Sequence, residues 1–327
     1  MSIVPPRRIP KLSKPPRLRS GDTICLVAPA SPPYNPSLLD MAKRRLSELG
    51  YEVCIGLHAR EKNGFLAGSD RHRVLDLNKA FRSKSVRAIF CVRGGYGTGR
   101  ILSQLDFTAL RRSPKILVGC SDLTTLLCGA LVRSGIMTFH GPTIQSLMQP
   151  DCPSFTWGSF LAQIGGTPEC LGPLGTHSPE SRSVVDCLYA GKATGRLVGG
   201  NLSIINSLIG TPFLPSLAGS ILCLEDVGET PFRIDRTLTH LLNVGLFNGV
   251  KGFALGTFDK CAYKPQDAES LQSLRDVVID RLRPLKKPIV LGLPFGHIPH
   301  NATLPLGATA TLDARRGELI IEEPGVN

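Results

Sequence analysis

Residues 115–131 read KILVGCSDLTTLLCGAL, and this stretch decides the fold of the first half of the chain. Its apolar start is typical of a buried strand that ends at Gly119, and residues 123–133 place apolar side chains at helical spacing. Ser121 therefore falls on a tight turn from strand to helix. A hydroxyl held there stands clear of the sheet. The free N–H groups of the first helical turn, that of Asp122 first, point toward any oxyanion beside it.

The same turn has a plainer interpretation. A serine followed by an aspartate before an apolar run is also an ordinary helix N-cap, and the turn alone favours that interpretation. Leu123 stands where the G-x-S-x-G elbow of α/β-hydrolases would have its second glycine. That signature is therefore absent.

Short apolar runs bounded by Gly or Pro alternate with helical patterns on both sides of this stretch. This alternation predicts an α/β fold with a parallel sheet covered on both faces. The expected strands lie at 23–30, 51–56, 86–94, 115–120 and 136–142, and the expected helices at 36–49 and 123–133. A second α/β unit with more irregular β connections follows, including SILCLED, a helix near 267–283 and PIVLGLPFG.

The 327 residues suffice for about two domains at roughly 150 residues each. Pro and Gly gather between the two halves, as they do in connections between domains. The expected division is a basic, Pro-rich arm at 1–19, a nucleophile domain at 20–147, a connection at 148–186 and a C-terminal domain at 187–327.

Composition narrows the class of protein. With 42% hydrophobic and 20% charged residues, the chain is expected to be globular, and neither a membrane span nor a signal peptide is expected. Half of the net charge of +12 lies in residues 1–20, and few aromatic residues accompany the rest, so we expect no nucleic-acid partner. The ten cysteines form no C-x-x-C pair, which favours reduced thiols and a cytoplasmic location.

A glycine-rich loop, CVRGGYGTGR at residues 91–100, follows an expected strand. Arg100 takes the place of the last glycine of a dinucleotide fingerprint, and no Walker lysine follows, so a nucleotide site is not expected. Glycines allow a backbone to approach a ligand closely, and Gly94 or Gly95 could offer a second oxyanion N–H. A merely tight turn explains the loop equally well.

A nucleophilic serine needs a base and a group that orients the base. His297 stands in PFGHIPHN at the end of an apolar run, whereas His140 ends a strand and could line a ligand pocket. Glu225 and Asp226 close the apolar strand SILCLED, where a carboxylate can hold an imidazole, although many strands simply end in charged residues.

The remaining histidines suggest no metal site. His58 and His72 lie in polar stretches and are expected to be solvated, His177 belongs to the connection, and His240 is expected to pack or cap a helix. A proline separates His297 from His300, and no H-E-x-x-H motif occurs. We therefore expect no metal ligands and no dependence on a metal ion.

Several motifs together resemble the LD-carboxypeptidase family of serine peptidases, which includes self-immunity hydrolases of microcin C-like peptide nucleotides. The resemblance runs from Gly21 to about Asp313. It is carried by GDTICLVAPASP, CVRGGYGTGRIL, LVGCSDLTTLL, FHGPT, GGNLSII, LEDVGETPFRIDRTLTHL and GHIPHNATLPLGATATLD. Cys120 departs from the aromatic residue that is frequent before the family's serine.

The resemblance implies a Ser121, Glu225, His297 triad that cuts an L,D peptide bond and releases D-Ala from murein tetrapeptides, without a cofactor. Arg93 or Arg236 could clamp the anionic peptide terminus, or either could be a structural ion pair. Two alternatives stay open: a self-immunity hydrolase of peptide nucleotides, and a peptide-binding protein without catalysis. The expected partner is a small peptide, with neither nucleic acid nor membrane, and a homodimer is among the states that the sequence allows.

Overall fold

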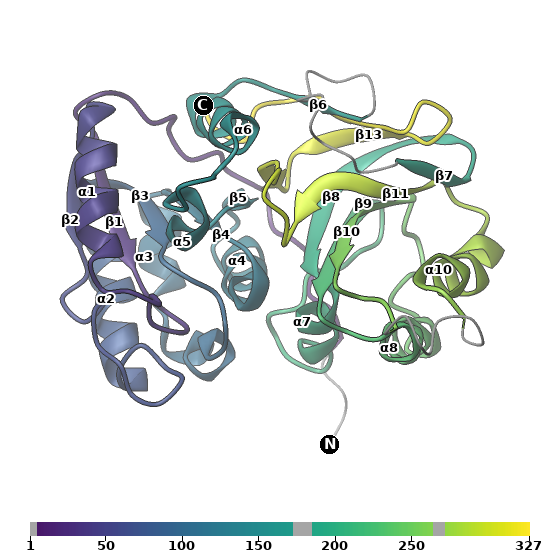
Figure 1. Ribbon diagram of the computed structural model, residues 1–327, viewed down its shortest axis with the longest axis horizontal. Coiled ribbons are helices and arrows are strands. Elements are labelled where there is room, and N and C mark those ends of the chain that lie inside the picture. The colour runs from purple at the N-terminus through teal and green to yellow at the C-terminus, as the bar shows by residue number, and fades with distance from the viewer. Residues whose placement is uncertain (1–4, 173–184, 264–271) are drawn as a thin grey trace.

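The computed structural model describes residues 5–172, 185–263 and 272–327, and contains two β-sheets with helices packed against them (Figure 1). The α/β class expected from the sequence is confirmed. Among the described residues, no helix is both long and apolar enough to cross a membrane.

The first sheet has six strands in the order β12-β5-β4-β3-β1-β2. Five are parallel to their neighbours, and β12 pairs antiparallel with β5 at the edge. The strands are β1 (Thr23–Val27), β2 (Glu52–Ile55), β3 (Val86–Cys91), β4 (Ile116–Gly119), β5 (Thr138–His140) and β12 (Leu304–Leu306).

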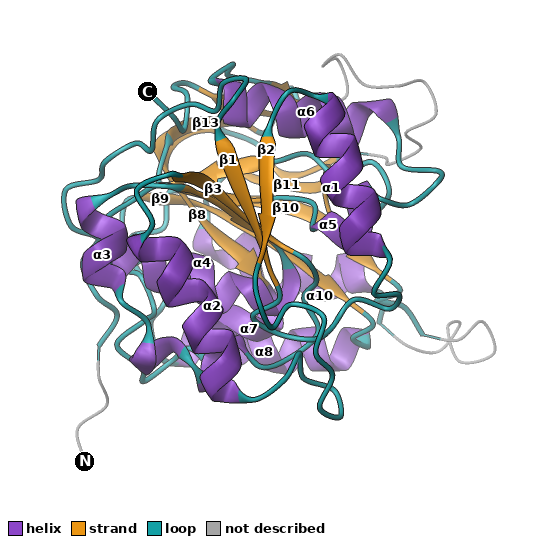
Figure 2. Cartoon of the chain, turned by 90° about the vertical axis from the view of Figure 1, so that its left-hand side faces the viewer, coloured by secondary structure: helices purple, strands orange, loops and turns teal. Residues whose placement is uncertain are grey.

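Helices cover both faces of this sheet because successive strand residues point to opposite sides. Helices α1, α5 and α6 lie on one side of the sheet, and α2, α3 and α4 lie on the other (Figure 2). Ile24 and Leu26 of β1 belong to the core on the side of α1, whereas Cys25 and Val27 belong to the core on the side of α2. The helices are α1 (Leu38–Glu48), α2 (Asp70–Arg82), α3 (Phe107–Arg112), α4 (Thr124–Arg133), α5 (Ile144–Leu147) and α6 (Ser154–Gly165), with 3-10 turns η1 (Thr98–Arg100), η2 (Leu102–Gln104) and η3 (Ser121–Leu123).

The second sheet has eight strands in the order β6-β14-β13-β8-β9-β10-β11-β7. Strands β8 to β11 are parallel, so their carboxyl ends lie at one edge. The strands are β6 (Cys170–Leu171), β7 (Asp186–Tyr189), β8 (Lys192–Asn201), β9 (Ser220–Val227), β10 (Gly252–Asp259), β11 (Ile289–Gly296), β13 (Thr309–Asp313) and β14 (Glu318–Ile321), and the helices are α7 (Leu202–Ser207), α8 (Pro231–Asn243), α10 (Leu274–Leu282) and the 3-10 turn η4 (Arg283–Leu285).

The two sheets are interlocked. Buried side chains of α4, β8 and β9 belong to one continuous hydrophobic core. Strand β12 belongs to the second half of the chain but pairs with β5 of the first sheet, with Leu304 opposite His140. The segment expected to be a separate C-terminal domain, 187–327, therefore supplies a strand to the first sheet.

The expected connection, 148–186, is more ordered at its start than its composition indicates. Helix α6 occupies part of it, and Trp157, Phe160 and Ile164 pack into the core beside α1. The apolar spacing of these three residues is helical, but the prolines and glycines around them obscured the pattern. Residues 173–184 lie outside the described residues, as do residues 264–271, where the helix near 267–283 was expected to begin.

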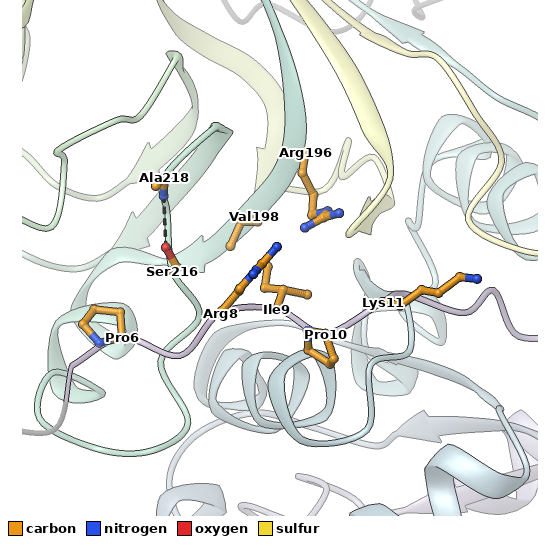
Figure 3. A pocket seen from close by; sticks show the side chains of 9 residues that line it. All are labelled: Pro6, Arg8, Ile9, Pro10, Lys11, Arg196, Val198, Ser216 and Ala218. Carbon is orange, nitrogen blue, oxygen red and sulfur yellow. Dashed lines mark hydrogen bonds between the residues drawn. The ribbon is translucent and has the colours of Figure 1, made fainter.

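The basic arm lies along the surface and hydrogen-bonds to both halves of the molecule. The Arg7 backbone pairs with the segment at Pro215 in the second half, and the Ser13 N–H donates to the carbonyl of Gly135 in the first half, at 2.8 Å. Ile9 and Leu18 of the arm are buried. With β8, the arm borders a cavity of about 870 Å³ into which Arg8 and Arg196 point (Figure 3).

Candidate active site

Ser121 occupies a strained turn between β4 and α4. Its φ angle is +63°, a left-handed conformation that costs a residue with a side chain about 1–3 kcal/mol. The strand ends at Gly119, and a Cβ there would lie 2.6 Å from a Leu123 side-chain carbon. Glycine thus leaves room for the chain to reverse, and among the described residues no hydrogen bond engages the Ser121 hydroxyl.

The glycine-rich loop packs directly against Ser121. A Cβ at Gly94 would lie 2.7 Å from the Ser121 Cβ and 3.1 Å from its Oγ, so only glycine fits. Gly95 adopts a φ of +94°, and its backbone is pressed against the Ser31 side chain. Of the two glycines expected near Ser121, Gly94 therefore contacts it, and Gly95 contacts Ser31.

The Asp122 side chain joins these two loops. Its carboxylate accepts hydrogen bonds from the Thr98 N–H, at 2.8 Å, and from the Thr98 hydroxyl. Burial raises the pKa of Asp122, and the bonds from Thr98 oppose that shift. The carboxylate is thus engaged in structure, and only the backbone N–H of Asp122 is suited to an oxyanion. Sequence reasoning missed Thr98, because a threonine in a loop carries no distinctive signal.

Glu225 and His297 meet at the carboxyl ends of β9 and β11. Glu225 Oε2 lies 2.6 Å from His297 Nδ1, and the glutamate side chain is fully buried. Gly296 adopts a φ of +122°, and a Cβ there would lie 3.1 Å from the Glu225 Cβ. Burial lowers the pKa of His297, but the hydrogen bond and charge of Glu225 outweigh burial, so the pKa of His297 is raised.

The Asp226 carboxylate, next to Glu225 in sequence, is bonded to Asn201 and Ser203 and not to His297. Asp226 accepts hydrogen bonds from Asn201 Nδ2 at 2.9 Å and from the Ser203 N–H and hydroxyl at 3.0 and 2.7 Å. The backbone N–H of Asn201 in turn donates to Thr124 Oγ1, at 3.1 Å, at the start of α4. Asp226 therefore supports the turn beside Ser121, and the carboxylate that orients His297 is Glu225.

His140 lies behind Glu225 and lines no described cavity, which differs from the ligand-pocket position considered for it. The ring is fully buried, and its Nε2 lies 3.9 Å from Glu225 Oε1. Neither ring nitrogen nor Glu225 Oε1 has a hydrogen-bond partner in the described residues. Burial lowers the pKa of His140, partly opposed by the charge of Glu225. A neutral histidine thus backs the carboxylate.

A cavity of about 390 Å³ opens beside these groups and is lined by both halves of the chain. Cys120, immediately before Ser121, lies on its wall with His297, Gln145 and Thr156. Burial raises the pKa of the Cys120 thiol to about 12, with a further contribution from Glu225. The thiol is therefore protonated at neutral pH and is unsuited to act as a nucleophile.

The two arginines considered as clamps lie in different places. Arg93 donates to the Pro32 carbonyl at 3.0 Å and stacks 3.7 Å from the Tyr34 ring centre. It borders a second cavity, of about 440 Å³. Arg236 is exposed on α8, stacks on Phe232, and borders neither this cavity nor the one beside His297.

His58 and His72, expected to be solvated, are partly exposed and also have a common partner. Both rings hydrogen-bond to the carboxylate of Glu61, at 2.7 and 2.6 Å. Glu61 lies three residues after His58, whereas His72 lies in the first turn of α2, and the path of the loop into α2 brings His72 to the other two. His240, expected to pack or cap a helix, lies on α8 and its Nδ1 contacts Asn206 Oδ1 at 2.7 Å. His177 lies outside the described residues.

Family profiles match both halves of the chain. The LD-carboxypeptidase N-terminal domain matches residues 24–141, and the C-terminal domain matches residues 194–312. This chain belongs to the LD-carboxypeptidase family. As a carboxypeptidase of that family, it carries Ser121 in its N-terminal match and Glu225 with His297 in its C-terminal match.

Relatives span nearly the whole chain. A probable murein peptide carboxypeptidase of Bacillus subtilis is 36% identical and covers 94% of each chain. The murein tetrapeptide carboxypeptidase of Pseudomonas aeruginosa is 32% identical over 90% of this chain and 94% of its own. The crystal structure of an MccF-like protein from Bacillus anthracis superposes with a TM-score of 0.83 at 28% identity, covering 94% of this chain and 98% of its own.

Proposed function

We propose that this LD-carboxypeptidase hydrolyses the L,D peptide bond of murein tetrapeptides and releases D-Ala, with Ser121, Glu225 and His297 as its catalytic residues. The observation that carries the proposal is the 2.6 Å hydrogen bond between buried Glu225 and His297, beside a cavity that is also lined by Cys120, the residue before Ser121. The relatives named as murein peptide carboxypeptidases support the substrate.

The first half of the reaction forms an acyl-enzyme. Glu225 holds His297 Nδ1, so Nε2 is the nitrogen left to take the Ser121 hydroxyl proton as Oγ attacks the carbonyl carbon. The backbone N–H of Asp122 and that of Gly95, or of Gly94, donate to the oxyanion. When the C–N bond breaks, His297 Nε2 returns the proton to the amine of D-Ala.

The second half regenerates the serine. Water gives a proton to His297 and attacks the acyl carbon, and the Ser121 oxygen leaves with that proton. The tripeptide departs with a new carboxylate. Every proton moves between Ser121, His297 and the reactants, so this route requires neither a cofactor nor a metal ion.

Arg93 is the better of the two arginines as the clamp for an anionic peptide. Tyr34, on which Arg93 stacks, donates its backbone N–H to Gln145 Oε1 at 3.1 Å, and Gln145 lines the cavity beside His297. A substrate that extends from His297 past Gln145 would meet the guanidinium. Arg236 has no such connection to the site.

Hydrolysis of a peptide nucleotide for self-immunity is the second candidate, supported by the likeness to the MccF-like protein. Both reactions would use the same three residues, so the substrate alone separates them. We propose the cytoplasm as the location, since all ten cysteines are free thiols, as expected in a reducing compartment.

The proposal is tested by incubating the protein with purified murein tetrapeptide and following tripeptide and D-Ala by mass spectrometry. Release of both by the wild-type protein, and by neither Ser121→Ala nor His297→Gln variants, is the expected result. Peptide binding without cleavage by the wild-type protein would favour a binding protein instead. Cleavage of an aminoacyl sulfamoyl nucleotide alone would favour the self-immunity reaction.

A further inference from the structure

Two imidazoles and one carboxylate converge on the surface loop between β2 and α2. His58 Nδ1 lies 2.7 Å from Glu61 Oε1, and His72 Nδ1 lies 2.6 Å from Glu61 Oε2. One potential ligand atom from each residue lies within 4.8 Å of the others. The rings stack with their centres 3.9 Å apart and their planes 14° from parallel. Both Nδ1 atoms thus face the same carboxylate.

The backbone around this cluster is fixed. The His58 N–H donates to Asp76 Oδ2 at 2.9 Å, which ties the loop to the middle of α2. His72 lies in the first turn of α2, where its N–H donates to the capping Ser69 hydroxyl at 3.2 Å. The cluster is therefore anchored at both ends before any ligand arrives, which lowers the entropic cost of binding.

Gly68 leaves the space that the carboxylate fills. Its φ is +78°, and a Cβ there would lie 2.3 Å from Glu61 Oε2. The Glu61 carboxylate thus occupies space that any residue larger than glycine at position 68 would fill. The side chains of His58, Glu61 and His72 keep 17%, 39% and 39% of their surface exposed, so solvent reaches the group.

We propose that His58, Glu61 and His72 form a binding site for a borderline divalent transition-metal ion, of which Zn²⁺ is the type. Two neutral imidazoles and a carboxylate are ligands that Zn²⁺ accepts, with water in the fourth position of a tetrahedron. A hard cation such as Mg²⁺ prefers oxygen ligands and would not be held well here. With the ion bound to Nδ1, each neutral ring would carry its one proton on Nε2, so that no proton remains between either ring and Glu61.

The ion would act on the substrate cavity through the loop. Arg60, Lys62 and Phe65, on the same loop as His58 and Glu61, line the cavity that Arg93 borders. Fastening this loop to α2 would fix the cavity wall. The ion lies apart from the reacting atoms, because none of the three ligands lines the cavity that holds His297.

Co²⁺ is the probe for the test, since its visible spectrum reports coordination and its near-ultraviolet spectrum reports thiolate ligands. Protein treated with a chelator and exchanged into metal-free buffer is titrated with Co²⁺, with Mg²⁺ as a parallel arm. We expect one Co²⁺ per chain, tetrahedral visible bands and no thiolate charge-transfer band, and no response to Mg²⁺. Zn²⁺ should then displace the Co²⁺.

Glu61→Gln and His72→Gln should each weaken Co²⁺ binding by at least about tenfold. Mutating a group that only hydrogen-bonds to a metal ligand already lowers metal affinity by about that factor, and these two residues would be ligands themselves. His240→Asn is the matched control, since it removes a surface histidine that has no carboxylate partner among the described residues, and its binding should equal that of the wild type. Thermal unfolding checks that each variant is folded. If only one of the two ligand variants folds, that variant alone is enough for the test.

Two results would overturn the proposal. One is a wild-type protein that binds no more Co²⁺ than the Glu61→Gln variant. The other is a thiolate band that persists in both variants, which would place the ion on cysteines. Because binding is read without substrate, its failure is distinct from a failure of the proposed hydrolysis.

Discussion

At the scale of single residues, the site depends on which of two adjacent carboxylates faces His297. The sequence offers Glu225 and Asp226 equally, since both end the same strand. Successive strand residues point to opposite sides, so only one of them can reach the imidazole. Glu225 does so, whereas Asp226 is held by Asn201 and Ser203. The strand pattern predicts such a division but not its direction, which the family resemblance supplied.

Replacing Glu225 with Gln should lower kcat by on the order of 10⁴-fold, because the amide no longer holds the correct imidazole tautomer. The carboxylate also raises the pKa of His297, and the base must be neutral to accept a proton. The rate of the variant should therefore begin to rise at a lower pH. The profile of kcat/KM against pH measures both effects.

Glu229→Gln serves as the control for this experiment, since Glu229 pairs with Arg233 at 3.4 Å and makes no contact with the imidazole. Its pH profile should match that of the wild type. An unchanged profile in the Glu225 variant would remove Glu225 from the mechanism.

His140 should make the protein less stable in acid. Its folded-state pKa lies below the ordinary value of 6.5, so between these values the unfolded chain binds more protons. Its contribution to stability is present above about pH 6.5 and is lost as the pH falls toward the folded-state pKa. His140→Gln should therefore lose less Tm than the wild type between about pH 7.5 and 5.5. Equal losses of Tm would mean that His140 titrates normally.

At the scale of elements, the strained turn at Ser121 and the glycine-rich loop form one unit. Gly94→Ala should lower kcat by on the order of 10²-fold, because its Cβ would lie 2.7 Å from the Ser121 Cβ and displace the hydroxyl. Steady-state kinetics on the tetrapeptide measures the loss.

Gly99→Ala on the same loop is the matched control. A Cβ there meets only a Thr125 methyl, at 3.9 Å, and it should leave kcat near the wild-type value. If the two alanine variants were equally active, the contact between loop and serine would have no part in catalysis.

The sequence predicts the elements of the first sheet well, because its strands are short apolar runs and its helices are strongly periodic. The helix expected at 36–49 occurs as Leu38–Glu48, and its buried residues include Leu38, Leu39 and Leu46. Helix α6 was missed among prolines and glycines. Pairing of β12 with β5 joins residues more than 160 positions apart, and no local pattern reports such a contact.

Only some residues of the candidate site could be predicted from the sequence. Ser121, Glu225 and His297 carry motifs, so their positions could be inferred. Thr98 beside Asp122, and His140 behind Glu225, act through burial and long-range contacts. The convergence of His58 and His72 on Glu61 likewise depends on the path of one loop.

At the scale of the whole molecule, the proposed residues come from both halves of the chain. Fragments 1–150 and 185–327 should each be inactive on the tetrapeptide, because Ser121 lies in one and Glu225 with His297 in the other. The first fragment also lacks β12, the edge strand of its own sheet. Activity assays on each purified fragment, with circular dichroism to report folding, test this. Turnover by either fragment alone would contradict a shared site.

Covalent labelling of Ser121 tests the central claim most directly. The intact protein is treated with a serine-reactive fluorophosphonate, and the adduct is mapped by peptide mass spectrometry, with heat-unfolded protein and the Ser121→Ala variant as controls. Our account predicts a single adduct on Ser121 in the folded protein, loss of tetrapeptide cleavage in step with labelling, and no adduct in either control. An adduct on another serine, or full cleavage by Ser121→Ala, would contradict it.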